Sequence, residues 1–361
     1  MHIPDGYLSP QTCLVTGAAA LPLTWRAMRA VRAGMASVQL PHISLGAAFA
    51  FVIQMINVPV PDGTTAHATG APLLAVALGP WAAVLALTAT LAIQALLFAD
   101  GGILALGANV LNIAVLAPFS TYAVYWLLTR GQPSPRRQVW AAAAGAFVGI
   151  HVAAMATAIE LGIQPLLFLA ADGTPLYAPY PLSLAVPAML YAHLLVAGPL
   201  EAAVTALAVA YLIRTGYPLY GTRIGRAGAS TAQAGGYAVG VAGTGAEGEA
   251  VGGVPRWAWR GLGLLAVLTP LGLLASGTAW GEWGIEELEA QLGYVPRELA
   301  RWVEWWSGLL PDYSVPALGD GGGAAVLGYW LSLALGVAVI LVLFYAAARL
   351  LSRSQRSPQE E

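Results

Sequence analysis

The first residues of the chain, Met-His-Ile-Pro, carry nitrogen atoms at a spacing that suits a transition metal. The terminal amine of Met1, the amide nitrogen of His2 and the His2 imidazole can hold one ion in fused five- and six-membered chelate rings. The ion must displace the amide proton, and Cu(II) and Ni(II), which favour tetragonal nitrogen sites, are the natural candidates. Pro4 has no N–H, so amide coordination cannot extend past Ile3. The opening therefore predicts three nitrogen ligands from two residues.

A fourth ligand would complete a planar site, and His67 in the loop PVPDGTTAHATG is the candidate. This loop precedes a short apolar stretch that ends at Gly79-Pro80, and membrane transport proteins tend to build substrate sites at short or interrupted spans. The alternative is an accidental terminal histidine and a solvated loop histidine, and the residues alone leave both interpretations open. If Met1, His2 and His67 do bind a metal ion, low pH should weaken binding, because the imidazoles and the amine must lose protons.

Uncharged polar side chains inside the apolar stretches form a second set of candidates. Hydrogen bonding between helices explains any one of them. Asn109 and Asn112 lie three residues apart and are expected to share a helix face, from which they would orient His67 or the amino-terminal arm. The residues proposed for this supporting role are Gln54, Gln94, Asn109 and Asn112.

Interior histidines allow a different class of function, a membrane-embedded metalloenzyme that uses His67, His151 or His193. A catalytic zinc site typically has three protein ligands and a carboxylate base, and no HExxH or comparable cluster occurs in the sequence. A buried histidine is more often a packing residue, and Glu201, a carboxylate inside an apolar stretch, is either paired or functional. A third class is a structural scaffold, which would leave the first ten residues free to vary.

The composition is that of a membrane protein, because only 9% of the 361 residues are charged, against about 25% in soluble domains. The stretch 71–98 is about 42 Å long at 1.5 Å per residue and contains Gly79-Pro80, so we expect two helices there. An all-α membrane fold follows, with seven transmembrane helices and then two more. The apolar stretches are 8–25, 40–58, 71–98, 106–128, 139–163, 183–213, 261–279 and 326–348.

Arginine placement sets the predicted orientation. All 16 basic residues are arginine, and an amino terminus outside the cell places fourteen of them in cytoplasmic segments, as the enrichment of positive charge there requires. The carboxyl terminus is then cytoplasmic. A chain without lysine cannot contain the phosphate loop GxxxxGK[ST], so another chain would hydrolyse any ATP. The net charge of −2 argues against a nucleic-acid partner.

The chain divides into a seven-helix domain (1–214), a Gly- and Ala-rich cytoplasmic linker (215–255) and a two-helix domain (256–361). Between the last two helices, the segment EWGIEELEAQLGYVPRELARWVEWW mixes charges with tryptophans. We expect it on the outer surface, with its aromatic rings at the lipid headgroups. The outer-loop carboxylates that would attract cations, a role such residues usually lack, are Asp62, Asp100 and Asp172.

Three segments, MHIPDGYLSP, QMINVPVPDGTTAH and GPWAAVLALTATLAIQALLFADGGILALGANVLNIAV, resemble the CbiM/NikM family. Members are the substrate-capture subunits of energy-coupling-factor transporters for cobalt and nickel. The resemblance implies a seven-helix fold with its amino-terminal arm inserted among the helices. It also implies a metal ion held by the amine, an amide nitrogen and two histidines, which match Met1, His2 and His67 here.

The same resemblance implies a place in the cell membrane beside a transmembrane coupling (T) subunit and paired ATPase subunits. The segments QMINVPVPDGTTAH, GPWAAV and QALLFADGG are more similar to the nickel branch of the family than to the cobalt branch. Ni(II) is therefore the expected cargo, and Co(II) is the alternative. The sequence TTAH departs from relatives, which commonly carry Ser-Gly before the histidine. The segments LTPLGLLASGTAWGEWGIEEL and LPDYSVPALG resemble the accessory CbiN or PDGLE-like component, here fused to the same chain.

Overall fold

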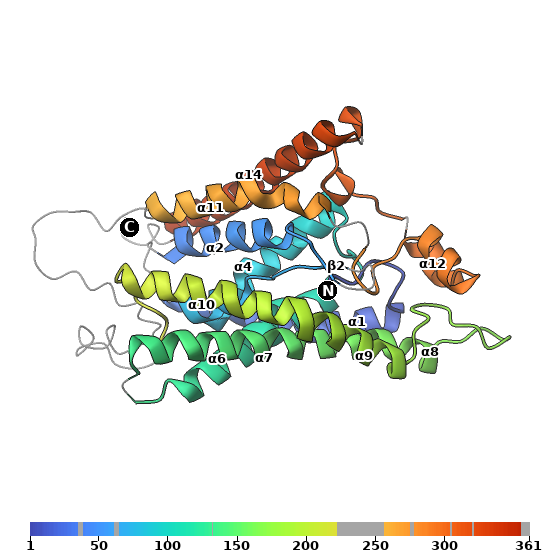
Figure 1. Ribbon diagram of the computed structural model, residues 1–361, viewed down its shortest axis with the longest axis horizontal. Coiled ribbons are helices and arrows are strands. Elements are labelled where there is room, and N and C mark those ends of the chain that lie inside the picture. The colour runs from blue at the N-terminus through green and yellow to red at the C-terminus, as the bar shows by residue number, and fades with distance from the viewer. Residues whose placement is uncertain are drawn as a thin grey trace, which may run out of the picture.

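The structure is a computed structural model in which long helices lie side by side along the longest axis of the molecule (Figure 1). The predicted linker at 215–255 falls almost wholly outside the described residues, as does Asp62. The residues that the structure describes are 1–34, 39–60, 65–131, 133–221, 256–274, 278–303, 305–319 and 321–354.

The first part of the chain contains most of the helices. They are α1 (Pro10–Gly34), α2 (Gln39–Gln54), α3 (Ala71–Leu78), α4 (Pro80–Ile93), η1 (Gln94–Phe98), α5 (Leu106–Asn109), η2 (Val110–Leu116), α6 (Ala117–Leu128), α7 (Pro135–Gly162), α8 (Gln164–Leu167), α9 (Leu182–Ala192), η3 (His193–Ala197) and α10 (Gly198–Arg214). Two short antiparallel strands, β1 (Val58–Pro59) and β2 (Thr65–Ala66), flank the loop before α3, with Val58 opposite Ala66.

The second part has two long helical segments with shorter elements between them. Its elements are α11 (Arg256–Leu268), η5 (Thr269–Leu274), α12 (Ile285–Leu292), α13 (Arg297–Trp302), η6 (Pro311–Tyr313), η7 (Pro316–Leu318) and α14 (Gly322–Ser354). Helix α14 packs along α2, and Gly336 makes this possible, because a Cβ there would lie only 2.1 Å from Cζ of Phe51. The Tyr329 hydroxyl also donates to the carbonyl of Met55 (2.7 Å). The two parts therefore share one core.

Among the described residues, five helical runs are long and apolar enough to cross a membrane. Two shorter apolar helices, Leu40–Gln54 and Trp259–Leu274, accompany them. The protein is thus a mainly helical, multi-pass membrane protein, and the division into seven and two crossings stays a prediction. The five runs are Pro80–Phe98, Leu106–Leu128, Pro135–Leu167, Leu182–Arg214 and Gly322–Leu350.

The predicted break at Gly79-Pro80 is present. Gly79 has φ 92°, a left-handed conformation that favours glycine, and Pro80 begins the next helix. The Tyr220 ring lies so close to Gly79 that a Cβ would be 2.7 Å away. Helix α3 is therefore only eight residues long, and it starts directly after the loop that carries His67.

Three π-helical segments interrupt the long helices: η1 begins at Gln94, η2 contains Asn112 and η3 begins at His193. Such segments are rare and are frequent at functional sites. They place polar side chains in the otherwise apolar interior.

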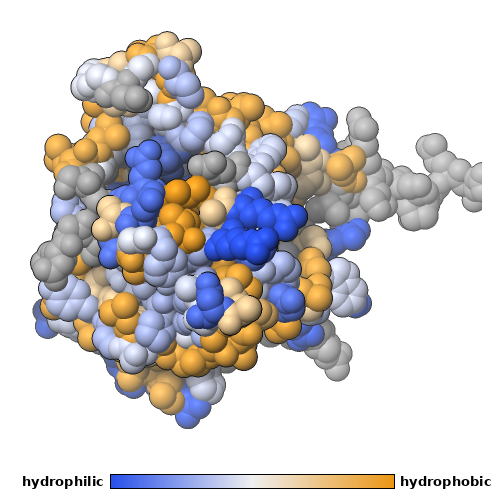
Figure 2. All heavy atoms as spheres, turned by 90° about the vertical axis from the view of Figure 1, so that its right-hand side faces the viewer, coloured by the Kyte–Doolittle hydropathy of each residue, from blue (hydrophilic) through white to orange (hydrophobic). Residues whose placement is uncertain are grey.

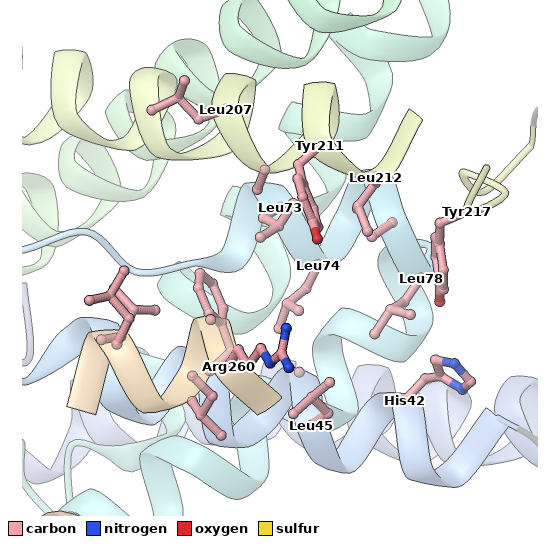
Figure 3. A pocket seen from close by; sticks show the side chains of 18 residues that line it. His42, Leu45, Leu73, Leu74, Leu78, Leu207, Tyr211, Leu212, Tyr217 and Arg260 are labelled. Atoms are coloured by element: carbon pink, nitrogen blue, oxygen red, sulfur yellow. The ribbon is translucent and has the colours of Figure 1, made fainter. Parts of the chain in front are cut away.

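The two ends of the bundle differ in character. Helices α8 and α12 project at one end (Figure 1), and Figure 2 shows this end face-on, with hydrophilic residues spread across it and apolar side chains between them and along the margin. Elsewhere an apolar groove of about 720 Å³ opens between α2, α3, α10 and α11. Figure 3 shows Leu45, Leu74 and Leu78 lining it, with Arg260 reaching in from α11.

Candidate metal centre at the amino terminus

The amino terminus lies inside the protein. In Figure 1 it is found among the helices beside β2, and Met1, His2 and Ile3 are 8%, 2% and 1% exposed. The expectation of an arm inserted among the helices is confirmed. Burying a charged amine and an imidazole is costly unless each has a polar partner, so the partners of the arm define the site.

Asn109 holds the backbone of the arm. Its Oδ1 accepts from the Ile3 N–H (2.8 Å), and its Nδ2 donates to the Ile3 carbonyl (3.1 Å), which also accepts from the Gly102 N–H (2.8 Å). Gly102 must be glycine, because a Cβ would lie 2.1 Å from Oδ1 of Asp5. The proposed supporting role of Asn109 fits this geometry.

Asp5 anchors the next turn of the arm. Its carboxylate accepts from the backbone N–H groups of Ile103, Leu104 and Ala105 at 2.8–3.2 Å, just before α5 begins. The indole N–H of Trp305 donates to the same carboxylate (2.8 Å). With four N–H donors around it, the carboxylate fixes the depth to which the arm inserts.

His2 lies between two oxygen acceptors. Its Nδ1 is 2.6 Å from Oδ1 of Asp100, and its Nε2 is 3.2 Å from Oε1 of Gln54. Burial disfavours ionisation of Asp100, but the charge of His2 and the hydrogen bonds with His2 and Tyr313 outweigh it and hold the pKa of this carboxyl well below its usual range. The sequence predicts Asp100 in an outer loop, where it would attract arriving cations. In the structure, its carboxylate instead contacts the His2 ring.

His67 lies beside His2. The two rings stack with centroids 5.0 Å apart and planes 28° from parallel. The contact of His67 Nδ1 with the Ala68 carbonyl (3.2 Å) is to an acceptor, so Nδ1 carries the proton and Nε2 keeps the lone pair. Burial, together with the positive charges of the amine and His2, holds the pKa of His67 well below its usual range. His67 is therefore a neutral imidazole ready to act as a ligand.

Glu201 on α10 fixes the loop that carries His67. It is fully buried and accepts from the Thr69 hydroxyl (2.9 Å) and from the N–H groups of Thr69 and Gly70. Gln54 adds a bond from its Nε2 to the Thr69 carbonyl (2.9 Å) while its Oε1 faces His2. The sequence left the partner of Glu201 open. In the structure, the partner is Thr69, which lies two residues after His67 in the sequence.

Glu201→Gln should lower metal affinity. The amide can accept from fewer N–H groups, so the loop would hold His67 less rigidly, and loss of an outer partner typically costs about 10- to 100-fold in metal affinity. Calorimetric titration measures the effect. Glu298→Gln is the matched control, because the Glu298 carboxylate pairs with Arg301 (3.7 Å) and has no hydrogen bond or ion pair to the arm or the loop of His67 within the described residues. Its variant should bind like the parent. Equal affinities for all three proteins would contradict the role given to Glu201.

The second part of the chain closes over the arm. The charged amine of Met1 lies 2.6 Å from Oε1 of Glu282, and the Tyr7 hydroxyl donates to the Trp283 carbonyl (2.7 Å). The Tyr313 hydroxyl donates to Asp100. Sequence reasoning missed Glu282 and Tyr313, since no local pattern links them to the arm.

The tryptophans between α11 and α14 do not all lie where the sequence predicts them. Trp280 and Trp283 pack against Tyr180, with ring centroids 5.0 and 5.4 Å away, and Trp305 bonds to Asp5. Two of the rings placed at the lipid headgroups by sequence, Trp283 and Trp305, thus pack on the first part of the chain. The segment covers the site.

Gln94 and Asn112, both predicted to support the site, have different roles. Gln94 Nε2 donates to the Tyr313 hydroxyl (3.1 Å) and lies 3.4 Å from Oδ2 of Asp100, so it belongs to the network around His2. Asn112 instead donates to Glu160 (2.6 Å) and Thr157 on α7. Among the described residues, Asn112 has no hydrogen bond to the arm or to His67. The prediction that it shares a face with Asn109 is wrong because Asn112 lies in the π-helical segment η2.

Side chains alone do not make a metal cluster here. Across the described ranges, no group of three or more His, Cys, Asp or Glu side chains has the arrangement of a metal site. A ligand set from Met1, His2 and His67 has only two such side chains, because two of its four nitrogens belong to the backbone.

Sequence comparison assigns both parts of the chain. Residues 2–218 match the CbiM family, described as the cobalt uptake substrate-specific transmembrane region, and residues 256–353 match the PDGLE domain. The fused nickel transport protein NikMN of Rhodobacter capsulatus is 45% identical over 99% of this chain and 100% of its own length. The probable fused nickel transport protein LarMN of Lactiplantibacillus plantarum is 42% identical over 95% of this chain and 96% of its own.

A crystal structure agrees with these matches. A truncated transition metal transporter is 56% identical to this chain, covering 60% of it and 99% of its own length, with a TM-score of 0.57. The matched families and relatives make the protein a component of metal transport and not an enzyme. The chain belongs to the CbiM family, in the fused form that carries a PDGLE domain behind the transmembrane region.

Proposed function

We propose that this chain is the substrate-capture subunit of an ATP-driven importer and that it binds Ni(II) through Met1, His2 and His67. One observation carries the proposal: Met1 and His2 at the amino terminus are buried inside the bundle, and the His2 ring stacks on the buried ring of His67. The nitrogen atoms are the terminal amine, the His2 amide, His2 Nδ1 and His67 Nε2. Four nitrogens of this kind suit a tetragonal Ni(II) ion.

The two carboxylates beside the ligands have a defined task in this proposal. Glu282 holds the amine, and Asp100 holds His2 Nδ1. Both nitrogens must lose a proton before they can bind an ion, and the carboxylates next to them stabilise the incoming positive charge. Asp100 suits this role because its low pKa keeps it ionised. The arm itself stays in place, because Asn109 and Asp5 hold it through atoms that the metal ion does not use.

Nickel is the proposed cargo because two fused relatives, 45% and 42% identical, are named as nickel transport proteins. Cobalt is the alternative, since other relatives are named as cobalt transport proteins CbiM. We propose that the protein lies in the cell membrane with the amino terminus outside and the carboxyl terminus in the cytoplasm. A transmembrane coupling subunit and ATPase subunits would supply the energy, because a chain without lysine has no phosphate loop with which to bind ATP itself.

Nickel affinity should fall as the pH falls. Binding releases protons from the amine, the amide and His2, so each released proton weakens affinity by roughly tenfold per pH unit. His67 should not contribute, because its depressed pKa keeps Nε2 unprotonated through this range. Titrating the purified chain with Ni(II) and with Co(II) at several pH values tests both the function and its pH dependence. Absence of saturable binding of either ion would overturn the proposed function, and pH-independent affinity would overturn the ligand set.

A further inference from the structure

A small cavity adjoins His67 on the side of α9. Its volume is about 20 Å³, and it is lined by His67, His193, Met189 and Met1, among others. A cavity of this size holds a single small occupant, such as one water or one ion. The imidazoles of His67 and His193, which come from different parts of the chain, therefore border the same small cavity.

His193 lines the cavity with an imidazole whose hydrogen bonding can be assigned. It begins η3 and is 6% exposed. Its Nδ1 lies 2.7 Å from the Met189 carbonyl, which can only accept, so Nδ1 carries the proton and Nε2 keeps the lone pair. Within the described residues, no hydrogen bond to His193 Nε2 is found. His193 and His67 thus border the cavity in the same protonation form.

His151 on α7 extends this line of imidazoles. Its ring centroid is 6.4 Å from that of His193, and its Nδ1 donates to the Phe147 carbonyl (2.6 Å). Its Nε2 is buried and has no hydrogen-bond partner among the described residues. Gly198 keeps α10 against this ring, because a Cβ there would lie 2.6 Å from His151 Cε1. An unpartnered buried nitrogen is costly and calls for a role.

We propose that His193 and His151 form an inner metal-binding pair that accepts the ion from His67 during release. The proposal rests on the proposed function, since it needs an ion delivered to His67. The step is a ligand exchange without redox change: His193 Nε2 bonds to the divalent ion as its bonds to His67 Nε2, the amine, the amide and His2 Nδ1 break. The protons that binding released return to the amine, the amide and His2. His151 Nε2 then supplies a second imidazole ligand. The ion thereby moves away from the arm and into the bundle.

The test compares equilibrium binding with uptake in the His193→Gln variant of the full chain. Ni(II) binding to the purified protein should stay within about threefold of the parent, because His193 lies outside the capture set. Nickel uptake by cells that express the chain with its coupling and ATPase subunits should fall at least tenfold. His151→Gln should reduce uptake in the same direction, and His193→Met, which keeps a metal-binding side chain, should retain part of it.

His42→Gln is the matched control, because His42 lines the apolar groove far along α2 from the site, and it should change neither quantity. Normal uptake by His193→Gln would overturn the proposal. Loss of both binding and uptake would also overturn it, because His193 would then act in capture or in folding. Failure of the parent protein to bind nickel would overturn the proposed function instead, so the two ideas fail in different ways.

Discussion

A chain with one alanine added ahead of Met1 should lose nickel affinity by about a hundredfold or more. The extension turns the terminal amine into an amide and moves the chelating nitrogens away from His67. It also removes the ion pair with Glu282 and inserts a residue where Met1 is 8% exposed. The expected loss exceeds the 10- to 100-fold typical of an outer partner, because a direct ligand is removed. Calorimetric titration with Ni(II) measures it.

An alanine added after Glu361 is the matched control, because it changes the length equally and leaves the arm untouched. That protein should bind like the parent. A melting curve for both proteins separates lost binding from lost folding. Unchanged affinity in the amino-terminally extended chain would exclude the amine as a ligand, whatever the fate of the histidines.

His67→Ala should produce a loss of similar size. His67 supplies the only proposed ligand that comes from outside the first two residues, so its removal leaves a three-nitrogen set open to exchange. The bonds from Glu201 to Thr69 and Gly70 would keep the loop in place without the imidazole. The fold should therefore survive the substitution. Titration with Ni(II) gives the affinity, and thermal unfolding gives the stability.

His42→Ala is the control for His67→Ala, since it removes a histidine on the same domain that lies in the groove between α2 and α10. If both variants kept the affinity of the parent, His67 would be no ligand. If both lost it, the effect would be one of folding. Only a loss confined to His67→Ala supports the proposed site.

The sequence predicted those features of the site that follow from local chemistry. Adjacent nitrogens at the start of the chain predicted the chelate, and Gly79-Pro80 predicted the end of α3, because both depend on neighbouring residues. The remaining features depend on residues far apart. Glu282 meets the amine across 281 positions and Tyr313 meets Asp100 across 213, and no periodicity encodes such pairs.

Helix geometry explains the wrong prediction for Asn112. The rule that residues three apart share a face holds for an α-helix. Asn112 lies in the π-helical segment η2, where the wider turn changes the angle between successive side chains. Asn109 therefore faces the arm while Asn112 faces Glu160 on α7. No local pattern marks this segment, because most of its residues are as apolar as those of the adjoining helix α6.

X-ray absorption at the nickel edge of the loaded protein tests the central claim most directly. Binding through the amine, the amide, His2 Nδ1 and His67 Nε2 predicts a planar ion surrounded by four nitrogens, with imidazole scattering from two rings. An octahedral, oxygen-rich surrounding would contradict it, because the ion would then bind carboxylates and water and not the amino-terminal arm.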